Sequence, residues 1–529
     1  MKSNDQKKVA ASMGNWIGLD RRGFLALLGG LPALSGTLSG SALAQGTPHK
    51  GGILRVSAPA NPSSLDPATG GAGSDHVFLY TMFDTLVAYD YASLQPIPGL
   101  AESWSFPDPT TFVLNIRPGV LFHDGTQCDA AAVKFNLDRN RSGERSNIRP
   151  DLETVTDVTV SGPNQVTLKL SQPDTALPLI LSDRAGMMCS PMAVQERGKD
   201  HDRNPVGAGP WKFVSWANAE KIVVTRNEQY WRPGRPYLDG VELSIITEIN
   251  TGLRSVIAGQ NDFIYFLSPQ QKQVIDRAKG LTAVSGPTLY CVQLYLNWGR
   301  PPFNDVRVRQ AMNYAVDREE FNKATMNGLS EPAVLTLPAA HWAHDKALDN
   351  AYPYDPDKAR RLLAEAGYKD GIDINMIGYT DQRSQQRQEV LIEQYKKAGI
   401  RLHFTNGSLA EMSAAFLSER KGDGFLSAWT GRPDPSLTYQ LLFGAGADYN
   451  PSRVEAVPEI GPALRATRAA EDIESRKKAF AVLQRLVTDN ALVVPLLFQF
   501  EMDAHNAKVK GYRPNLLGKP KFEDVYLEG

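Results

Sequence analysis

Residues 98–139 read PGLAESWSFPDPTTFVLNIRPGVLFHDGTQCDAAAVKFNLDR, a pattern of strands followed by a helix. Alternating apolar residues over 110–122 predict a hairpin that turns at Pro118 and Gly119. Asp129 precedes a run with helical spacing and is the expected N-cap of a helix over 129–140. We expect the FHDG segment (122–125) to form a structural turn. Strands joined to a helix in this way indicate a mixed α/β fold.

The same alternation of strands and helices continues on both sides of this stretch. We expect a strand over 51–60 and a hairpin over 155–171 that turns at 162–164. Helical patterns cover 305–328, 355–368 and 474–490, and residues 386–404 read as a helix, Gly399 and a strand. Asp355 is the expected N-cap of the second of these helices, and Gly367 marks its end. The whole pattern predicts an α/β protein with a β-rich insertion near 100–210.

Length and composition exclude several classes of protein. A chain of 529 residues exceeds what a single core usually supports, so at least two domains are expected. The net charge of −1 gives no basic field for nucleic acid, and we expect no nucleic-acid partner. The three cysteines, Cys128, Cys189 and Cys291, form no disulfide framework and no CxxC motif. One disulfide between two of them is still compatible with the sequence.

The N-terminal segment predicts export. Arg21 and Arg22 precede Phe24 and Leu25, as in a twin-arginine signal, and an apolar stretch diluted by glycines ends in ALA at 42–44. An ordinary secretory signal that happens to contain two arginines is the alternative. The stretch is too polar for a membrane anchor. We expect cleavage after residue 44 and a periplasmic protein that is soluble once the signal is removed.

Motifs for catalysis or for a cofactor are absent from the sequence. The chain contains no GxSxG, HExxH or GxxxxGK[ST] pattern, so we expect no catalytic residues, no cofactor and no enzyme activity. His341 and His344 are three residues apart and could share a metal, although a solvated loop explains them better, and no metal site is expected. His123 and Asp124 could form a catalytic pair, but a turn bonded within itself is favoured.

Several segments of the chain together resemble one family. The stretch over 98–139 closely resembles the signature of the family 5 extracellular solute-binding proteins, which are the dipeptide-, oligopeptide- and nickel-binding receptors of ABC importers. Further resemblance lies, in the family's order, at LDPA (65–68), FDTLVAYD (83–90), GAGPWKFVSW (207–216), NEQYWRPGRPYLDGVEL (227–243), NWGRPPFNDVRVRQAMNYAVDREEF (297–321) and VKGYRPNLLGKPKFEDVYL (509–527). The resemblance covers almost all of the chain after the export segment.

This resemblance implies a fold and a role. The fold is α/β and two-lobed, as in periplasmic binding proteins, with two hinge crossings and an extra β-rich subdomain. By analogy lobe I takes residues 45–90, 205–294 and 498–529, the subdomain 91–204, and lobe II 295–497. The implied function is capture of a small molecule or peptide between the lobes and delivery to an ABC permease, by a protein expected to be a monomer. The alternatives are a receptor for a nickel chelate or haem, and a periplasmic chaperone that binds peptides.

The segment WTGRPDP (429–435) carries the most specific expectation about the ligand. In peptide-binding relatives an acidic residue three positions after this Trp pairs with the ammonium group of the peptide, whereas here the position holds Arg432. A guanidinium suits a carboxylate or phosphate, so the ligand is expected to be anionic. Trp429 would supply an apolar wall, and Gly431 would allow close backbone approach. Alternatively, Arg432 pairs with Asp434 or with an acid from the other lobe and never contacts the ligand, or the register shifts and Asp434 takes the ammonium role.

Four further residues are candidates for the ligand site. Ser63 follows the first predicted strand, where ligands meet α/β lobes. Arg383 and Arg387 stand at a helix start, where an anion can be held, although a solvated helix face explains them equally well. Tyr290 lies next to the first expected hinge crossing, and a buried tyrosine with a bonded hydroxyl is the alternative.

Overall fold

The computed structural model describes residues 48–70, 72–447, 449–470 and 472–528. The expected export segment, residues 1–44, lies outside them. Residues 48–529 group into one structural unit by their contacts. None of the helices in the described ranges is long and apolar enough to cross a membrane.

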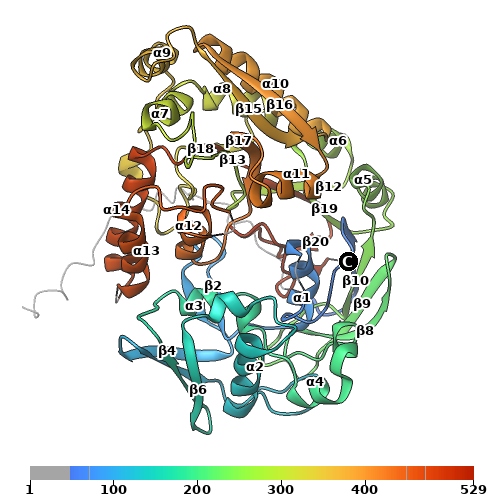
Figure 1. Cartoon of the computed structure of the whole chain (residues 1–529). Helices are drawn as coiled ribbons and strands as arrows, with labels where there is room; N and C mark the ends of the chain where they lie inside the picture. Colours follow the sequence, from blue (N-terminus) through green and yellow to red (C-terminus); the bar gives the residue numbers. More distant parts are fainter. Residues whose placement is uncertain (1–47, 71, 448, 471, 529) are drawn as a thin grey trace, which may run out of the picture. The chain divides into compact units, whose positions relative to one another are not determined.

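A seven-stranded sheet joins strands from the beginning, middle and end of the described chain (Figure 1). Its order is β12 (Leu281–Gly286), β19 (Glu501–Asn506), β11 (Phe263–Leu267), β1 (Ile53–Ala58), β10 (Gly240–Ile245), β9 (Lys221–Arg226) and β8 (Trp211–Ala217). The strand predicted over 51–60 is therefore confirmed as β1, and it lies in the middle of the sheet. Its neighbours are α1 (His76–Met82), α5 (Ile249–Ile257) and α6 (Lys272–Arg277), with the short ribbons β2 (Val87–Tyr89)–β3 (Pro96–Pro98) and β20 (Val509–Lys510)–β21 (Tyr526–Leu527).

A four-stranded antiparallel sheet forms the β-rich insertion. Its order is β4 (Ala101–Asp108), β5 (Thr111–Ile116), β7 (Gln165–Leu170) and β6 (Val155–Gly162), with α2 (Ala130–Ser142), α3 (Leu177–Ile180) and α4 (Pro191–Arg197) beside it. The hairpin predicted over 155–171 is confirmed. The hairpin predicted at Pro118 and Gly119 is wrong, because β5 pairs instead with β4 and β7. The tight turn falls at Asp108, whose carboxylate accepts hydrogen bonds from the backbone and hydroxyl of Thr110.

A six-stranded mixed sheet builds the third part of the fold. Its order is β14 (Glu331–Pro332), β18 (Val493–Phe498), β13 (Cys291–Leu296), β17 (Gly424–Trp429), β15 (Ile372–Tyr379) and β16 (Ile400–Gly407). The helices of this part are α7 (Val306–Tyr314), α8 (Arg318–Met326), α9 (Pro356–Glu365), α10 (Gln382–Lys397), α11 (Leu409–Ser413), α12 (Pro435–Phe443), α13 (Ile460–Ala469) and α14 (Ile473–Asp489). Gly399, at φ +78°, joins α10 to β16, which confirms the predicted helix–Gly–strand unit.

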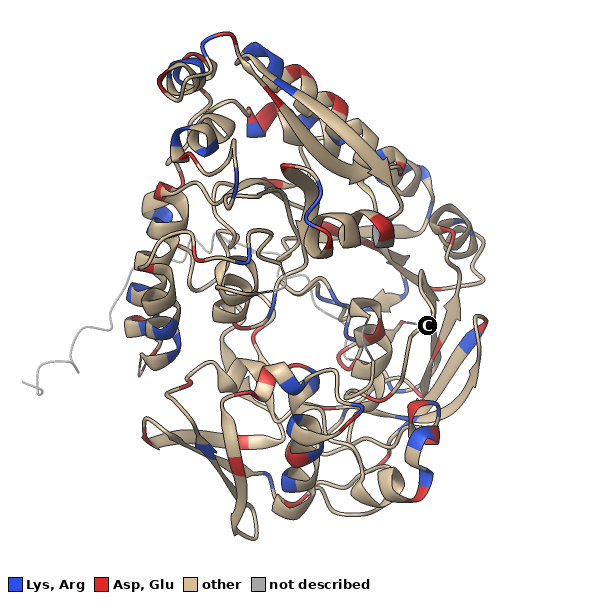
Figure 2. Cartoon of the chain, viewed as in Figure 1, with Lys and Arg blue, Asp and Glu red and all other residues tan. Residues whose placement is uncertain are grey.

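The chain passes between the seven-stranded and the six-stranded sheet twice, first between β12 and β13 and then between β18 and β19. The predicted helical stretch over 305–328 is divided into α7 and α8, because Asp317 starts a new helix by accepting a hydrogen bond from the backbone of Glu320. The predicted N-caps Asp129 and Asp355 are confirmed by their bonds to Ala132 and Lys358. Figure 2 shows charges of both signs spread over this view, in keeping with the net charge of −1.

Candidate functional site

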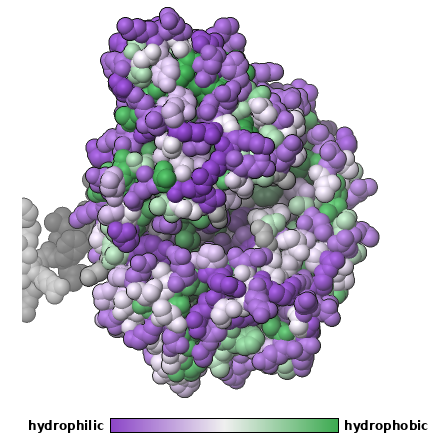
Figure 3. Space-filling model, in the orientation of Figure 1, coloured by the Kyte–Doolittle hydropathy of each residue, from purple (hydrophilic) through white to green (hydrophobic). Residues whose placement is uncertain are grey.

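A cavity of about 1550 Å³ lies between segments that follow the two larger sheets. One wall comes from the seven-stranded part, at residues 247–250 and at 268–274 around α6. The opposite wall comes from the six-stranded part, at the start of α10, the end of α11 and the C-terminal half of β17. Figure 3 shows this face of the chain hollowed between its upper and lower parts. A solute in this cavity would contact both parts at once.

Arg383 and Arg387 line the cavity from the first turns of α10. Asp381 caps this helix by accepting a hydrogen bond from the backbone of Ser384, so the helix start is fixed. The Arg383 side chain makes no hydrogen bond or ion pair with any described residue. Arg387 is buried and donates to the Gln499 side chain over 2.9 Å, but its Nε has no partner. Burial, and then the neighbouring Arg383, lowers the pKa of Arg387 to about 10.

Aromatic side chains form much of the remaining wall. Tyr290 lines the cavity beside Arg387, at the start of β13, and its backbone carbonyl accepts a hydrogen bond from Gln499. Burial raises the pKa of Tyr290, so its hydroxyl stays protonated near neutral pH. Tyr379, whose hydroxyl lies 2.8 Å from that of Ser427, and Phe425 also line the cavity. Single polar groups set between aromatic rings are typical of small-molecule sites.

The Trp429–Arg432 loop borders the cavity through Thr430. Trp429 is 2% exposed and donates its indole N–H to Thr438, and the Arg432 guanidinium lies 5.1 Å from the Trp429 ring. Gly431 has φ +76°, and a Cβ added there would lie 2.3 Å from Leu289 Cβ. Gly431 is therefore required for close approach to Leu289, next to the first crossing between the two sheets. Arg432 itself is half-buried, and its hydrogen bond is to the Gly431 carbonyl.

Asp434 lies apart from this cavity. It is fully buried, caps α12 by accepting from the backbone of Ser436, and pairs with Arg476 of α14 through contacts of 2.9 Å. The alternative in which Arg432 pairs with Asp434 is therefore wrong. Arg476, 42 residues further along the chain, satisfies the carboxylate instead.

A second polar cluster, which we name the inner cluster, surrounds Asp183. Asp183 accepts a 2.6 Å hydrogen bond from His76 at the start of α1, and Arg184 contacts Asp75. The exposed Ser63 joins this cluster, because its backbone and hydroxyl both donate to Asp75. Lys519 acts electrostatically on Asp183 from the C-terminal segment. No motif or spacing in the sequence relates positions 183 and 519, so sequence reasoning missed both.

The buried histidine and cysteine groups have structural explanations. Asp66, Cys189 and His201 lie close enough for a shared ion, but Arg139 and His201 already occupy the carboxylate of Asp66. Burial alone would raise the pKa of Asp66, but the hydrogen bonds and positive charges of His201 and Arg139 outweigh it and hold the pKa well below its usual value. This arrangement is an ion-pair network rather than an open metal site. The three cysteines, all within the described ranges, are buried and unpaired.

The remaining histidine candidates form ordinary structural hydrogen bonds. His344 contacts the Leu337 carbonyl and the Asp349 carboxylate, and His341 accepts from the backbone of Ala343. The ring nitrogens of His123 contact Gly209 and Gly207, while Asp124 bonds Thr126 and Ser190. His123 and Asp124 do not form a catalytic pair. The expectation that His123 bonds its neighbour within the turn is wrong, because its ring contacts Gly207 and Gly209, whereas Asp124 does accept from Thr126 within the turn.

Comparison with known proteins identifies the family. The sequence pattern of the bacterial extracellular solute-binding proteins, family 5 Middle, matches residues 95–450. The chain belongs to this family. It is therefore a solute-binding protein, and the family resemblance expected from the sequence is confirmed.

Individual relatives of this solute-binding protein agree with the assignment. The glutathione-binding protein GsiB of Salmonella paratyphi A is 28% identical over 427 residues, which cover 78% of this chain and 82% of the relative. GsiB of Pectobacterium atrosepticum is 29% identical over 478 residues, covering 83% and 91%. The periplasmic binding protein DppA of Helicobacter pylori, solved with the peptide STSA, aligns with a TM-score of 0.77 at 24% identity, covering 91% and 99%. The expected two-lobed α/β fold of periplasmic binding proteins is thus confirmed.

Proposed function

We propose that this solute-binding protein is the periplasmic receptor of an ABC importer and that it captures an anionic, peptide-like solute in the cavity lined by Arg383 and Arg387. The observation that carries the proposal is this pair of arginines, which faces a large cavity and forms no ion pair with a carboxylate of the described residues; Glu248, Asp381 and Glu389 also line the cavity. The solute is delivered unchanged to the permease, and a monomer suits that docking step.

Electrostatics favour an anion at this position. Two guanidinium groups one helical turn apart repel each other. Burial of Arg387 increases the free-energy cost of keeping its guanidinium charged. A bound carboxylate or phosphate would accept the unused N–H groups in charge-assisted hydrogen bonds and would remove the repulsion. The N-terminus of α10 adds a favourable partial charge.

The positive charge of Arg432 also supports an anionic solute. An ammonium group placed against Arg432 would lose hydration without gaining a counter-charge. Trp429, packed beside Arg432, would support the side chain, while Ser63 and Tyr290 would contribute polar contacts at the edges of the site. Asp434 is the weakest of the ligand-contact candidates, because Arg476 and α12 already use its oxygens.

The relatives agree with an acidic peptide conjugate as solute. The GsiB proteins are named for binding glutathione, a γ-glutamyl tripeptide with two carboxylates, and they align with most of this chain. A permease would recognise the closed state, in which the parts that carry the two larger sheets enclose the solute. The solute would favour this state by the binding free energy of the additional contacts that it makes there.

A thermal-shift screen of the purified protein tests this proposal. The panel comprises glutathione, γ-glutamyl dipeptides, opine-type acids, dicarboxylates, ordinary di- and tripeptides, and nickel chelates. A solute at 100 times its Kd should stabilise the protein by about 2.7 kcal/mol. We expect hits among the acids and recovery of each solute unchanged. Hits confined to neutral or cationic peptides, or turnover of a hit, would contradict the proposal.

A pair of matched variants tests whether the acidic solutes bind at Arg383. Arg383→Ala removes a charged donor from the cavity, so we expect Kd for acidic solutes to rise about 10- to 100-fold, as for loss of a charged hydrogen bond. Arg360→Ala on the exposed face of α9 is the control and should leave Kd unchanged. Equal affinities of the two variants would place the solute elsewhere.

We further propose that residues 1–44 direct export by the twin-arginine route. The paired Arg21 and Arg22 followed by Phe24 and Leu25 support it. We expect Arg21→Lys/Arg22→Lys to abolish export and to leave uncleaved precursor in the cytoplasm, measured by fractionation and immunoblotting. Normal export of the double variant would indicate an ordinary secretory signal.

A further inference from the structure

An aromatic surface lines the main cavity on the side of the six-stranded sheet. Tyr379 at the end of β15, Phe425 of β17 and Tyr449 from the loop between α12 and α13 all belong to the cavity lining. We name these three side chains the aromatic wall. Arg383 and Arg387 line the same cavity, so a solute bound there can contact both the arginines and the wall.

The register of the sheet places the wall on one face. Phe425 and Ser427 are two positions apart on β17, so their side chains point to the same side. The Tyr379 ring lies 5.4 Å from that of Phe425, and its hydroxyl lies 2.8 Å from the Ser427 hydroxyl. The Tyr449 ring lies 5.0 Å from that of Trp429, two positions beyond Ser427. The wall therefore follows β17 from Phe425 to Trp429.

The rings of the wall are held in place by the fold itself. Because the Tyr379 hydroxyl is bonded to Ser427, this side chain presents its ring to the cavity rather than a free hydroxyl. Phe425 is 2% exposed and packs on Phe416, with the two centroids 5.2 Å apart. Tyr379 and Tyr449 are half-buried and supply most of the accessible ring surface. A surface fixed in this way loses little conformational entropy when a solute binds.

Tyr379 links the wall to the two arginines. It ends β15, and α10 begins three residues later at Gln382. The side chain of Gln388, next to Arg387 on α10, donates to the Tyr379 carbonyl over 3.0 Å. The cavity of about 1550 Å³ exceeds the roughly 300–1,000 Å³ that is usual for small-molecule sites. It therefore has room for a solute with an anionic group at the start of α10 and a second group on the wall.

The opposite side of the cavity also offers apolar surface. Val274 of α6 is 48% exposed, Ile249 at the start of α5 is half-buried, and both line the cavity. Their neighbours in the lining, Asn250 and Gln271, are bonded to each other over 3.2 Å. Apolar surface inside a cavity gains free energy when a solute covers it. A purely polar acid would leave this gain unused.

A cationic group is the other occupant that aromatic rings can attract. It is disfavoured at this wall, because the Arg432 guanidinium lies 5.1 Å from the Trp429 ring, and Arg383 and Arg387 line the same cavity. The acidic residue of the opposite side, Glu248, is exposed, so solvent screens its charge. The charges therefore favour a neutral ring on the wall.

We infer that the captured solute carries an aromatic ring in addition to its anionic group, and that this ring binds against Tyr379 and Tyr449, with Phe425 behind them. Aromatic rings gain more from edge and face contacts with other rings than their buried area alone provides, which a saturated group does not. This inference rests on the proposed function and adds a second group to the same solute.

Three γ-glutamyl dipeptides test the inference by calorimetry with the purified protein. They are γ-glutamylphenylalanine, γ-glutamylcyclohexylalanine, whose saturated ring buries a similar area, and γ-glutamylglycine, which has no side chain. We expect γ-glutamylphenylalanine to bind roughly tenfold or more tightly than γ-glutamylglycine, and about threefold more tightly than the cyclohexyl analogue. Equal binding of either analogue, or no binding of γ-glutamylphenylalanine, overturns the inference. The proposed function would survive each of these results if other acids bind and lose affinity in Arg383→Ala.

Variants of Tyr379 place the ring on the wall. Tyr379→Leu should weaken γ-glutamylphenylalanine about fivefold or more and leave γ-glutamylglycine unchanged, whereas Tyr379→Phe keeps the ring and should leave both unchanged. Tyr354→Leu, at an exposed tyrosine outside this cavity, is the matched control and should change neither. Equal losses for both dipeptides in Tyr379→Leu would contradict the assignment. The ranking of the probes on the unaltered protein still decides the inference if Tyr379→Leu does not fold.

Discussion

Asp434→Ala is expected to lower the free energy of unfolding by about 3–5 kcal/mol, the usual cost of removing one partner of a buried ion pair. Asp434 is fully buried, and its oxygens accept from Arg476, from the backbone of Ser436 and from the Ser436 hydroxyl. Its removal leaves the Arg476 guanidinium, which is 5% exposed, without a counter-charge. Urea unfolding measures the loss as a lower midpoint at unchanged slope.

Asp472→Ala separates the ion pair from the helix cap. Asp472 caps α14 through the backbone of Ser475 as Asp434 caps α12, but Asp472 is exposed and has no buried cation. We expect a clearly smaller loss from Asp472→Ala. Asp434→Ala should keep its affinity for the solute at low temperature, where it remains folded. Equal losses in stability would mean that the ion pair with Arg476 adds nothing beyond the helix cap, whereas a selective loss of binding in Asp434→Ala would support Asp434 as a ligand contact.

Local features of the fold were predictable because they depend on neighbouring residues. The β6–β7 hairpin turns at Pro163 and Asn164 between runs of β-branched residues, and Asp355 bonds within the helix that it starts. The error at Pro118 and Gly119 has a physical reason. Two turn signals flank Thr110–Ile116, and the pairing of β5 with β4 and β7, which sequence does not display, decides which one reverses the chain.

The candidate site was only partly predictable, because its residues come together through tertiary contacts. Arg383 and Arg387 share a helix start, and their common position on the cavity follows from helical spacing. Lys519 and Asp183 are more than 300 positions apart, so no local pattern relates them. The choice of Arg476 rather than Arg432 as partner of Asp434 likewise depends on the packing of α14 against α12.

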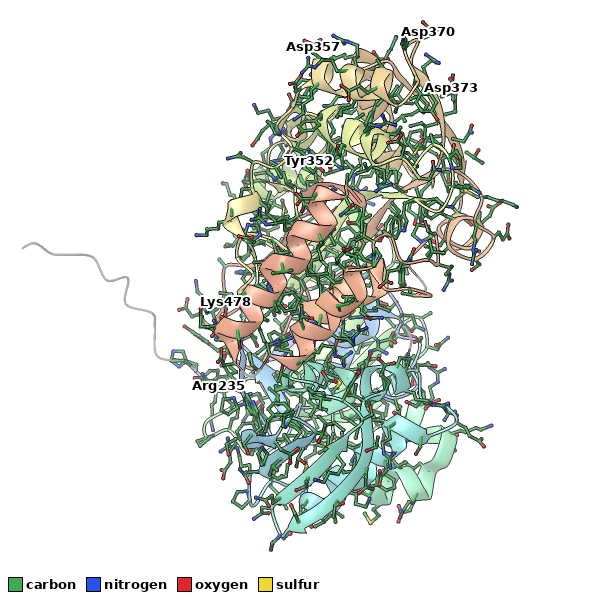
Figure 4. The ribbon with its side chains drawn as sticks, turned by 60° about the vertical axis from the view of Figure 1, so that its left-hand side comes forward. Arg235, Tyr352, Asp357, Asp370, Asp373 and Lys478 are labelled. Atoms are coloured by element: carbon green, nitrogen blue, oxygen red, sulfur yellow. The ribbon has the colours of Figure 1, made fainter. Side chains whose placement is uncertain are left out.

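Asp174→Ala is expected to lower the free energy of unfolding by about 3–5 kcal/mol, as Asp434→Ala does. Asp174 lies at the contact between the four-stranded part and α13. Both oxygens of the fully buried Asp174 accept from the guanidinium of Arg468, which is 8% exposed. The backbone and hydroxyl of Thr175 donate to the Arg468 carbonyl over 2.8 and 3.0 Å. Figure 4 shows α13 and α14 above the strands of this sheet.

The double variant Asp174→Leu/Arg468→Met distinguishes a buried ion pair from general packing at this contact. Apolar side chains of similar volume remove both charges, so we expect recovery of most of the stability lost in Asp174→Ala. Asp157→Ala on the exposed face of β6 is the control and should leave the urea midpoint unchanged. If the double variant is as unstable as Asp174→Ala, packing rather than an uncompensated guanidinium causes the loss. If both variants match the unaltered protein, the pair contributes nothing, and the Thr175 hydrogen bonds with the surrounding apolar contacts join the two parts.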